Sequence, residues 1–276
     1  MKEMTTREVQ LVSLEILKDV HEFCVKNGIK YSLSGGTLLG AIRHNGFIPW
    51  DDDVDIQMPR PDYDRFIHTY TSQKGYRVCS RELPEYEKKN MAYAYARVCD
   101  MEKTFVDTGV HPWISGDTGV WIDIFPCDGI SSDSAEAKKH LNHVDKLVRH
   151  SRLLAFRDFS LRKLKREERK MSNIKYFIKK LVSGIVPLST FDKMLALKKR
   201  YDYTTSDYFF ATTLKGFGEW QPKKNMESFE LHQFENAEFY IMSGYDANLR
   251  SLYDDYMVIP SENKRVVHAY NKHYWR

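Results

Sequence analysis

The sequence predicts an α+β fold in which helices flank a mixed β-sheet and a basic helical insertion occupies the middle of the chain. Three observations lead to this prediction. Strand-like and helix-like segments are mixed over residues 1–131, residues 132–200 are helical in pattern, and residues 201–276 return to mixed, aromatic-rich structure. Hairpin-length gaps favour this class over a regular βαβ array. We therefore expect an N-terminal core (1–131), a basic helical region (132–200) and a C-terminal region (201–276) that completes the core.

The composition is that of a globular chain. Of its 276 residues, 42% are hydrophobic and 29% charged, and the net charge of +4 is too small to indicate a nucleic-acid partner. We expect no such partner. No signal-like apolar segment begins the chain, and no apolar run reaches the ~18 residues of a membrane span. The prediction is a cytoplasmic protein, with the inner face of the membrane as the alternative location. Four cysteines without a CxxC pair favour buried, reduced thiols over a disulfide or zinc site.

End signals predict the first helix. Thr5-Thr6-Arg7-Glu8 has the pattern of a capping box, Asn27-Gly28 is a stop signal, and apolar residues recur at helical spacing between them. The segments that follow alternate: a strand over Ile29–Leu33, a helix over Thr37–Arg43, a strand over Val54–Met58 and a helix from Pro61 to about Thr71.

The next expected strands are Tyr76–Cys79, Ala92–Val98, Lys103–Val106 and Gly119–Pro126, the last ended by its proline. Helical periodicity then covers Ala135–Phe156, and an apolar stripe from Ile174 to Ile185 stops before Pro187. Residues 157–200 hold 14 Lys and Arg against 4 Asp and Glu. Two interpretations stay open: a solvated helical hairpin, or helices that lie on an anionic membrane.

The chemistry concentrates between Tyr31 and Tyr63. Gly35-Gly36 separates a strand from a helix, where a glycine turn lets backbone N–H groups approach a phosphate. Asp53 and Asp55 alternate on a strand, so they share a face and repel unless a cation lies between them. Asp123 interrupts a later apolar strand, and a buried carboxylate needs a metal, a basic partner or a proton. The pattern predicts a site for Mg²⁺ or Mn²⁺; a solvated acidic loop is the alternative.

A glycine pair at a helix start, followed by Asp-apolar-Asp and a later lone acid on a strand, resembles the nucleotidyltransferase superfamily. The likeness is sharper to the LicD family, whose signature resembles GGTLLGAIRHNGFIPWDDDVDIQMPRPDYDRF and whose second block resembles WIDIFPCDGI. A C-terminal trace resembles YDANLRSLYDDYMVIPSENKRVVHAY. The resemblance implies a nucleotidyltransferase-like core. It also implies transfer of phosphocholine, or a related phospho-alcohol, from a CDP-activated donor to a cell-surface glycan precursor such as teichoic acid or lipopolysaccharide, with release of CMP.

The resemblance implies roles for particular residues. Asp53 and Asp55 would hold Mg²⁺, and Asp123 would hold a second metal or act as the general base. One of Asp51 and Asp52 would assist the metal and the other would serve as a cap or salt-bridge partner. The expected contacts to the donor phosphates are Ser34, Gly35, Gly36, Arg43 and Asp52. The expected acceptor or phosphate contacts are Lys264, Arg265 and His268, with Lys264 and His268 on one side of a helix.

Several alternatives remain at this point. The donor is CDP-choline or another CDP-alcohol, because fukutin-related ribitol-phosphate transferases carry similar blocks; a glycerol phosphate donor is also open. A nucleotidyltransferase that uses an NTP on a small-molecule or protein acceptor is the second enzyme hypothesis. A lipid-linked precursor would bring the protein to the membrane through residues 157–200. Choline would require an aromatic enclosure, for which Trp113, Trp121 and Trp220 are candidates among many.

Overall fold

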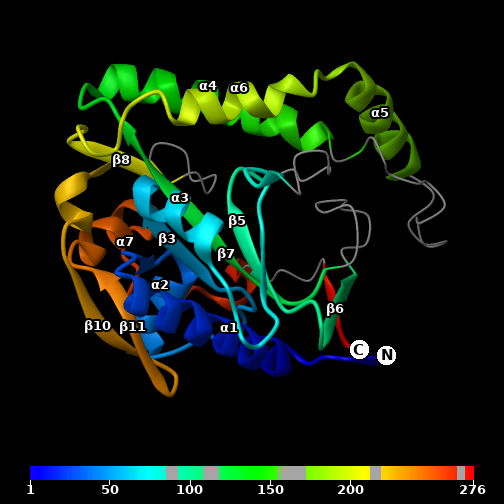
Figure 1. Ribbon diagram of the computed structural model, residues 1–276, viewed down its shortest axis with the longest axis vertical. Coiled ribbons are helices and arrows are strands. Elements are labelled where there is room, and N and C mark those ends of the chain that lie inside the picture. Colours follow the sequence, from blue (N-terminus) through cyan, green and yellow to red (C-terminus); the bar gives the residue numbers. More distant parts are fainter. Residues whose placement is uncertain (85–92, 108–117, 155, 157–171, 212–218, 266–270) are drawn as a thin grey trace.

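A computed structural model describes residues 1–84, 93–107, 118–154, 156, 172–211, 219–265 and 271–276. Strand β7 (Trp121–Ile130) is the centre of its main, seven-stranded sheet. It pairs in parallel with β3 (Asp55–Pro59), and antiparallel with β5 (Ala96–Cys99) and β8 (Tyr208–Ala211). The C-terminal part of the chain therefore contributes a strand directly to the sheet built by the N-terminal part (Figure 1).

The remaining strands of the main sheet are β2 (Ser32–Leu33) on β3, β4 (Arg77–Cys79) on β5, and β9 (Gln221–Pro222) on β8. A separate small sheet joins the two ends of the chain, with β1 (Lys2–Glu3), β12 (Lys272–Trp275) and β6 (Thr104–Asp107). The hairpin of β10 (Phe229–Phe234) and β11 (Ala237–Met242) stands alone as a pair. Helices α1 (Thr6–Asn27), α2 (Gly35–His44), α3 (Arg60–Thr69) and α7 (Tyr245–Tyr253) complete the core, with 3₁₀ turns η5 (Lys223–Met226) and η6 (Glu262–Lys264).

This architecture confirms the predicted α+β class. The first helix has the predicted ends: the Thr5 side chain accepts from the Glu8 N–H while the Glu8 carboxylate accepts from the Thr5 N–H. Gly28 follows the helix in the left-handed region at φ 59° and returns its N–H to the carbonyls of Cys24 and Val25. The local signals therefore set both ends of this helix.

The prediction that Pro126 ends its strand is wrong, because β7 runs on to Ile130. The N–H of Asp123 donates to the Val54 carbonyl at 2.8 Å, so alternation turns the nitrogen of Pro126 away from β3. On that other side, β5 pairs β7 only as far as Ile124 and β8 begins at Cys127. The missing N–H therefore falls in the gap between two partner strands, where no ladder hydrogen bond is lost.

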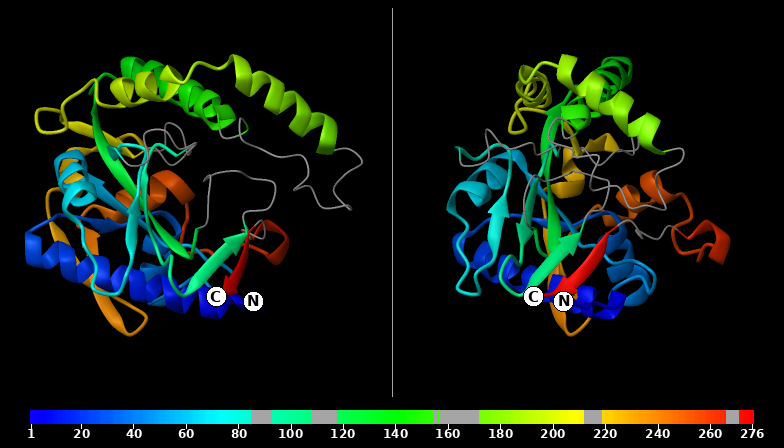
Figure 2. Two further views of the ribbon diagram at one scale, coloured as in Figure 1. Left: turned by 45° about the vertical axis from the view of Figure 1, so that its right-hand side comes forward. Right: turned by 90° about the vertical axis from the view of Figure 1, so that its right-hand side faces the viewer.

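The middle of the chain forms helices α4 (Ser134–Leu154), α5 (Ser172–Ile185) and α6 (Ser189–Lys198), as predicted. They lie together along one side of the molecule, across the top of both views in Figure 2. A second hydrophobic core joins α4 and α6 to the sheet, through side chains that include Leu141, Val148, Phe191, Met194 and Phe210. No helix in the described part of the chain is long and apolar enough to cross a membrane.

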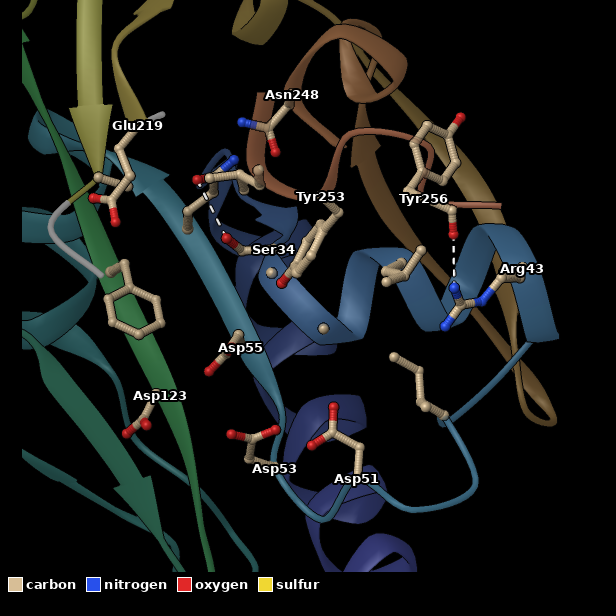
Figure 3. Close-up of a pocket in the computed structure, with 18 of the residues that line it drawn as sticks. Ser34, Arg43, Asp51, Asp53, Asp55, Asp123, Glu219, Asn248, Tyr253 and Tyr256 are labelled. Carbon is tan, nitrogen blue, oxygen red and sulfur yellow. Dashed lines mark hydrogen bonds between the residues drawn. The ribbon is translucent and has the colours of Figure 1, made fainter. Parts of the chain in front are cut away.

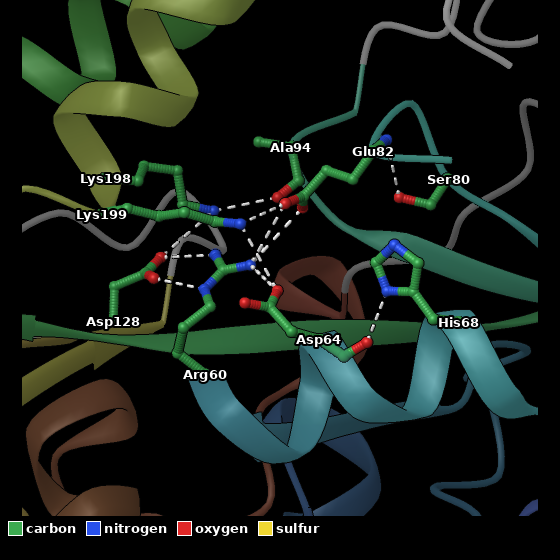
Figure 4. Close-up of polar contacts among 9 residues, drawn as sticks. All are labelled: Arg60, Asp64, His68, Ser80, Glu82, Ala94, Asp128, Lys198 and Lys199. Atoms are coloured by element: carbon green, nitrogen blue, oxygen red, sulfur yellow. Dashed lines mark hydrogen bonds and ion pairs between the residues drawn. The ribbon is translucent and has the colours of Figure 1, made fainter. Parts of the chain in front are cut away.

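A set of buried charges ties α6 to the core; we call it the buried ionic network, and Figure 4 draws it. Arg60 donates to both oxygens of Asp128, at 2.6 and 2.9 Å. The fully buried Lys198 donates to the Ala94 carbonyl at 2.9 Å and lies 3.7 Å from Asp128. Glu82, Asp64 and Lys199 complete the network. The Arg60 guanidinium is thus paired with three carboxylates of this network.

Burial opposes the charge of Lys198 and lowers its pKa to about 8, although Asp128 acts in the other direction. Burial also opposes the charge of Arg60, yet Asp128 and Glu82 outweigh it and raise the pKa of the guanidinium. The four cysteines are buried and free, as predicted from their spacing.

Candidate active site

The register of three strands places two of the predicted acids in one row, whereas Asp53, which was expected on the same strand as Asp55, lies just before β3. Asp55 on β3 is the partner of Asp123 on β7, and Arg97 on β5 is the partner of Asp123 from the other side. Residues two apart on a strand share a face, so the next row of the same face holds Gln57 and Phe125. The sheet thus presents a charged row beside a row that carries an aromatic ring.

The start of α2 lies against two of the carboxylates. Gly35 has a φ of 52°, in the left-handed region that favours glycine, and a Cβ there would lie 2.9 Å from Asp55 Oδ2. A Cβ on Gly36 would lie 2.6 Å from Asp51 Oδ2. The Asp55 N–H donates to Thr37 Oγ1 at 2.8 Å, which fixes β3 to the first turn of this helix. Because Gly35 and Gly36 have no side chains, the carboxylates of Asp55 and Asp51 can approach the N-terminus of α2 closely.

These residues line a cavity of about 610 Å³. Asp51, Asp53, Asp55 and Asp123 all belong to its wall, and Figure 3 draws them together below the α7 residue Tyr253. Burial raises the pKa of the Tyr253 hydroxyl, and the charges of Asp55, Asp51 and Asp53 raise it further. The predicted gathering of the acids is therefore present, and it includes Asp51.

The cavity carries a surplus of negative charge. Six carboxylates line it against two arginines, in a chain whose net charge is positive. Asp123 has a basic partner, since Arg97 Nε donates to its Oδ1 at 2.7 Å. Burial opposes the charge of Arg97, but Asp123 holds the pKa of the guanidinium well above its usual value. The sequence analysis required a metal, a basic partner or a proton for the buried Asp123 carboxylate. The structure supplies the basic partner, Arg97.

The predicted phosphate contacts divide into two groups. Ser34, Gly35, Gly36 and Arg43 line the cavity, whereas Asp52 is outside the wall that the described residues form. A backbone contact fixes the Arg43 guanidinium, because its Nη1 donates to the Tyr256 carbonyl at 2.6 Å. Partial burial lowers the pKa of Arg43.

Of the three C-terminal residues predicted to contact the acceptor or a phosphate, the structure describes the side chain of one, and the role itself stays a prediction. Arg265 lines the cavity. Its backbone is extended, at φ −72° and ψ 127°, because the helical turn ends at Lys264; the predicted helix from Lys264 to His268 is therefore wrong. The side chain of Lys264 and the whole of His268 lie outside the described residues.

Hard oxygen ligands of the kind that Mg²⁺ prefers surround the centre of the cavity. Among the described residues, no three His, Cys, Asp or Glu side chains converge closely enough to form a complete protein-only metal site. Mg²⁺ needs only one or two protein carboxylates when phosphate oxygens and water complete its shell. The residues present therefore fit a divalent cation that arrives with a phosphorylated substrate.

Some residues of the cavity were missed by sequence reasoning. Glu219, Asn248, Tyr253 and Trp50 line it without having been assigned a role there. Asn248 and Tyr253 lie within the C-terminal stretch that resembles the LicD family, and this resemblance was the signal that could have identified them. Glu219 has no motif around it, and only the pairing of β8 with β7 brings its segment to the site.

Two of the three tryptophans proposed for an aromatic enclosure make other contacts in the structure. The Arg97 guanidinium lies 4.1 Å from the Trp121 ring, and Trp220 stacks on Tyr208 with ring centroids 4.4 Å apart. Trp113 lies outside the described residues.

Comparison with known proteins supplies the family. Residues 28–140 match the model "LicD/FKTN/FKRP, nucleotidyltransferase domain". The chain is 31% identical over 279 residues to the lipopolysaccharide cholinephosphotransferase LicD of Haemophilus influenzae, covering 99% of each chain. A shorter match, 62% identical over 29 residues, is to the human ribitol 5-phosphate transferase FKRP, covering 10% of this chain and 6% of FKRP.

The matched region contains the glycine pair, the four aspartates of the cavity and their strands β3 and β7. The full-length match extends to the helices α4 to α6 and the C-terminal strands, so the similarity is not limited to the motif. The chain belongs to the LicD family of phosphotransferases.

Proposed function

We propose that this enzyme transfers phosphocholine from CDP-choline to a hydroxyl of a cell-surface glycan precursor, such as lipopolysaccharide or teichoic acid, and releases CMP. The observation that carries the proposal is the cavity in which Asp51, Asp53, Asp55 and Asp123 face the start of α2. The name of the Haemophilus relative supports choline as the alcohol. The name of FKRP supports ribitol phosphate as the alternative, with glycerol phosphate as a further candidate. We assign the core to the nucleotidyltransferase superfamily on the same motif order.

Asp53 and Asp55 are the residues that would hold Mg²⁺ or Mn²⁺, with Asp51 beside them. When bound, such a cation would neutralise charge on the phosphate oxygens and help the leaving group depart. Without a cation, the carboxylates that line the cavity would repel the anionic phosphates of the donor. We therefore expect the cation and the donor to bind together.

The chain's own residues orient the donor. Ser34, Gly35 and Gly36 line the cavity at the start of α2, and we expect the glycine N–H groups to donate to the diphosphate together with the Ser34 hydroxyl, which donates to Gln57 Oε1 at 3.4 Å in the structure. Arg43, held by the Tyr256 carbonyl, binds a phosphate oxygen from the other side of α2. These contacts hold the phosphorus in line between attacking and leaving oxygens.

In the reaction, the acceptor oxygen forms a bond to the phosphorus that carries the alcohol, and the bond from that phosphorus to the oxygen of CMP breaks. The acceptor proton leaves to a carboxylate, for which we propose Asp123. Arg97 fixes the orientation of Asp123 at 2.7 Å. Alternatively Asp123 holds a second metal that activates the hydroxyl.

The test is incubation of the purified protein with CDP-choline, CDP-ribitol, CDP-glycerol or each NTP, with a lipopolysaccharide or teichoic acid precursor as acceptor. CMP release that depends on acceptor, stops with EDTA and returns with Mg²⁺ is the expected result. Pyrophosphate release from an NTP would instead favour the nucleotidyltransferase hypothesis. A chain that releases neither product with any donor would overturn the proposal.

We also propose that the enzyme works at the inner face of the membrane, where a lipid-linked precursor is held. Helix α5 exposes Phe177, Ile178, Leu181 and Ile185, whose exposed fractions are 50, 52, 57 and 81%. Ser183 is buried on the opposite face. Residues 157–200 carry ten more positive than negative charges, which complements an anionic lipid surface.

Co-sedimentation with anionic and neutral vesicles tests this location. Binding to anionic vesicles that is lost in a Leu181→Asp, Ile185→Asp double variant supports it. The matched control places the same substitution at Leu231, an apolar residue 49% exposed on β10. Unchanged binding of the double variant would exclude α5 as the contact.

A further inference from the structure

The cavity is chemically divided along its length. Figure 3 shows Glu219 and Asp123 at one end and Arg43 and Tyr256 at the other, with Tyr253 and the remaining acids between them. An acidic end and a basic end in one cavity indicate a ligand whose two ends differ in charge.

Aromatic rings and a carboxylate make up the acidic end. Phe125 follows Asp123 by two residues on the same face of β7, and Tyr95 packs on it with ring centroids 4.5 Å apart at 50°. Phe209, on β8, also lines the cavity, and its strand partner Gln221 is two residues from Glu219. Glu219 lies there with 6% of its surface exposed. Ring faces and a largely desolvated carboxylate are what a quaternary ammonium requires, because it cannot donate hydrogen bonds.

The other end has two guanidinium groups and an indole ring, and Asp255, next to Tyr256 in the chain, also lines the cavity. Arg265 lies over Trp50, with its central carbon 4.3 Å from the ring centroid. Arg43 donates to the Tyr256 carbonyl at 2.6 Å and to the Val258 carbonyl at 3.3 Å, which fixes it beside this pair. Arginines favour phosphate, and a flat Arg–Trp pair favours a nucleobase.

We propose that the acidic end binds the trimethylammonium group of the donor, against Phe125, Tyr95, Phe209 and Glu219, and that the basic end binds CMP, at Trp50, Arg43 and Arg265. The inference rests on the proposed function, and it adds the residues that select which alcohol the CDP-linked donor carries. It agrees with the central place of the aspartates, since the diphosphate of a CDP-alcohol lies between its nucleoside and its alcohol. Ribitol, a neutral polyol, can donate hydrogen bonds to the carboxylate but lacks the positive charge that the carboxylate and the aromatic faces attract.

Calorimetric binding of the two halves of the donor tests the inference without turnover. Phosphocholine and CMP are titrated separately, each with Mg²⁺, into the wild type and single variants. Glu219→Gln keeps the shape and removes the charge, and Phe125→Leu removes a ring. Both are expected to weaken phosphocholine about tenfold and to leave CMP unchanged. Arg265→Gln is expected to do the reverse.

Glu230→Gln, an exposed glutamate on β10, is the matched control for the charge change and should alter neither titration. Thermal melts of each variant identify a folding defect, which would weaken both ligands together. If Glu219→Gln weakened the binding of both phosphocholine and CMP without a change in melting temperature, the proposed division of the cavity would be wrong. Unchanged phosphocholine binding in both Glu219→Gln and Phe125→Leu would also overturn it.

Turnover separates this inference from the proposed function. If the wild type releases CMP from CDP-choline, the ratio of kcat/KM for CDP-choline to that for CDP-ribitol should fall about tenfold in Glu219→Gln. An unchanged ratio would sink the inference and leave the phosphotransfer intact. A wild type that releases no CMP from any CDP-alcohol would sink the proposed function itself.

Discussion

Two groups of charges meet on opposite faces of strand β7, and they differ in whether the fold neutralises them. Asp123 and Asp128 are five residues apart on β7, so they point to opposite faces of the sheet. In the buried ionic network, three basic side chains meet three acidic ones. In the cavity, six carboxylates face two arginines. Charges that the fold neutralises hold elements together, whereas a surplus is stable only when a ligand brings the opposite charge.

The largest expected effect is on activity. Asp55→Asn should lower the rate of CMP release by about a thousandfold, because one carboxylate fewer would hold the cation beside the phosphates. Its melting temperature should stay level or rise, since removing one of several close like charges relieves repulsion. Steady-state kinetics and a thermal melt of the same sample measure both.

Asp62→Asn is the control and should change the rate little, because Asp62 pairs with Arg65 on α3 and does not line the cavity. An Asp55→Asn enzyme with wild-type turnover would show that the surplus charge of the cavity does not serve the metal.

The second effect is on stability. Asp128→Asn should lower the free energy of unfolding by about 3–5 kcal/mol, because Arg60 and Lys198 would lose their common buried partner. Urea unfolding followed by circular dichroism measures it. Asp64→Asn removes another acid of the same network, but that side chain is 41% exposed, so its loss should cost under about 1 kcal/mol. Equal costs for the two variants would contradict the distinction that we draw between buried and exposed partners.

The smallest effect is a pH dependence. The pKa of Lys198 is about 8 in the folded protein, below its ordinary value in the unfolded chain. Between these two values the unfolded chain binds more protons, so stability should rise with pH in the wild type relative to Lys198→Met. Below about pH 8 both states hold the proton and the difference should be flat. Unfolding free energies at several pH values from 7 to 10 measure this.

A Lys199→Met variant, which changes a side chain that is 40% exposed and keeps Lys198, is the comparison and should retain the rise in stability with pH. A wild-type curve parallel to that of Lys198→Met would show that Lys198 does not titrate in this window.

Much of the fold could be predicted because its signals are local. The capping box at Thr5, the stop at Gly28 and the apolar stripe up to Ile185 each act within a few residues, and each has the predicted result. Pro126 was misjudged because the effect of a proline in a strand depends on where the partner strands end. The division of the chain into three regions stays a prediction.

The sequence by itself determined which residues carry the chemistry near the glycine pair. Asp53, Asp55 and Asp123 were named from spacing, since alternation along a strand is a local property. Only the tertiary structure decided that Asp51 rather than Asp52 lines the cavity, that Arg97 pairs with Asp123, and that Glu219 reaches the site. These depend on strand pairing across some twenty to ninety residues, which no local pattern encodes.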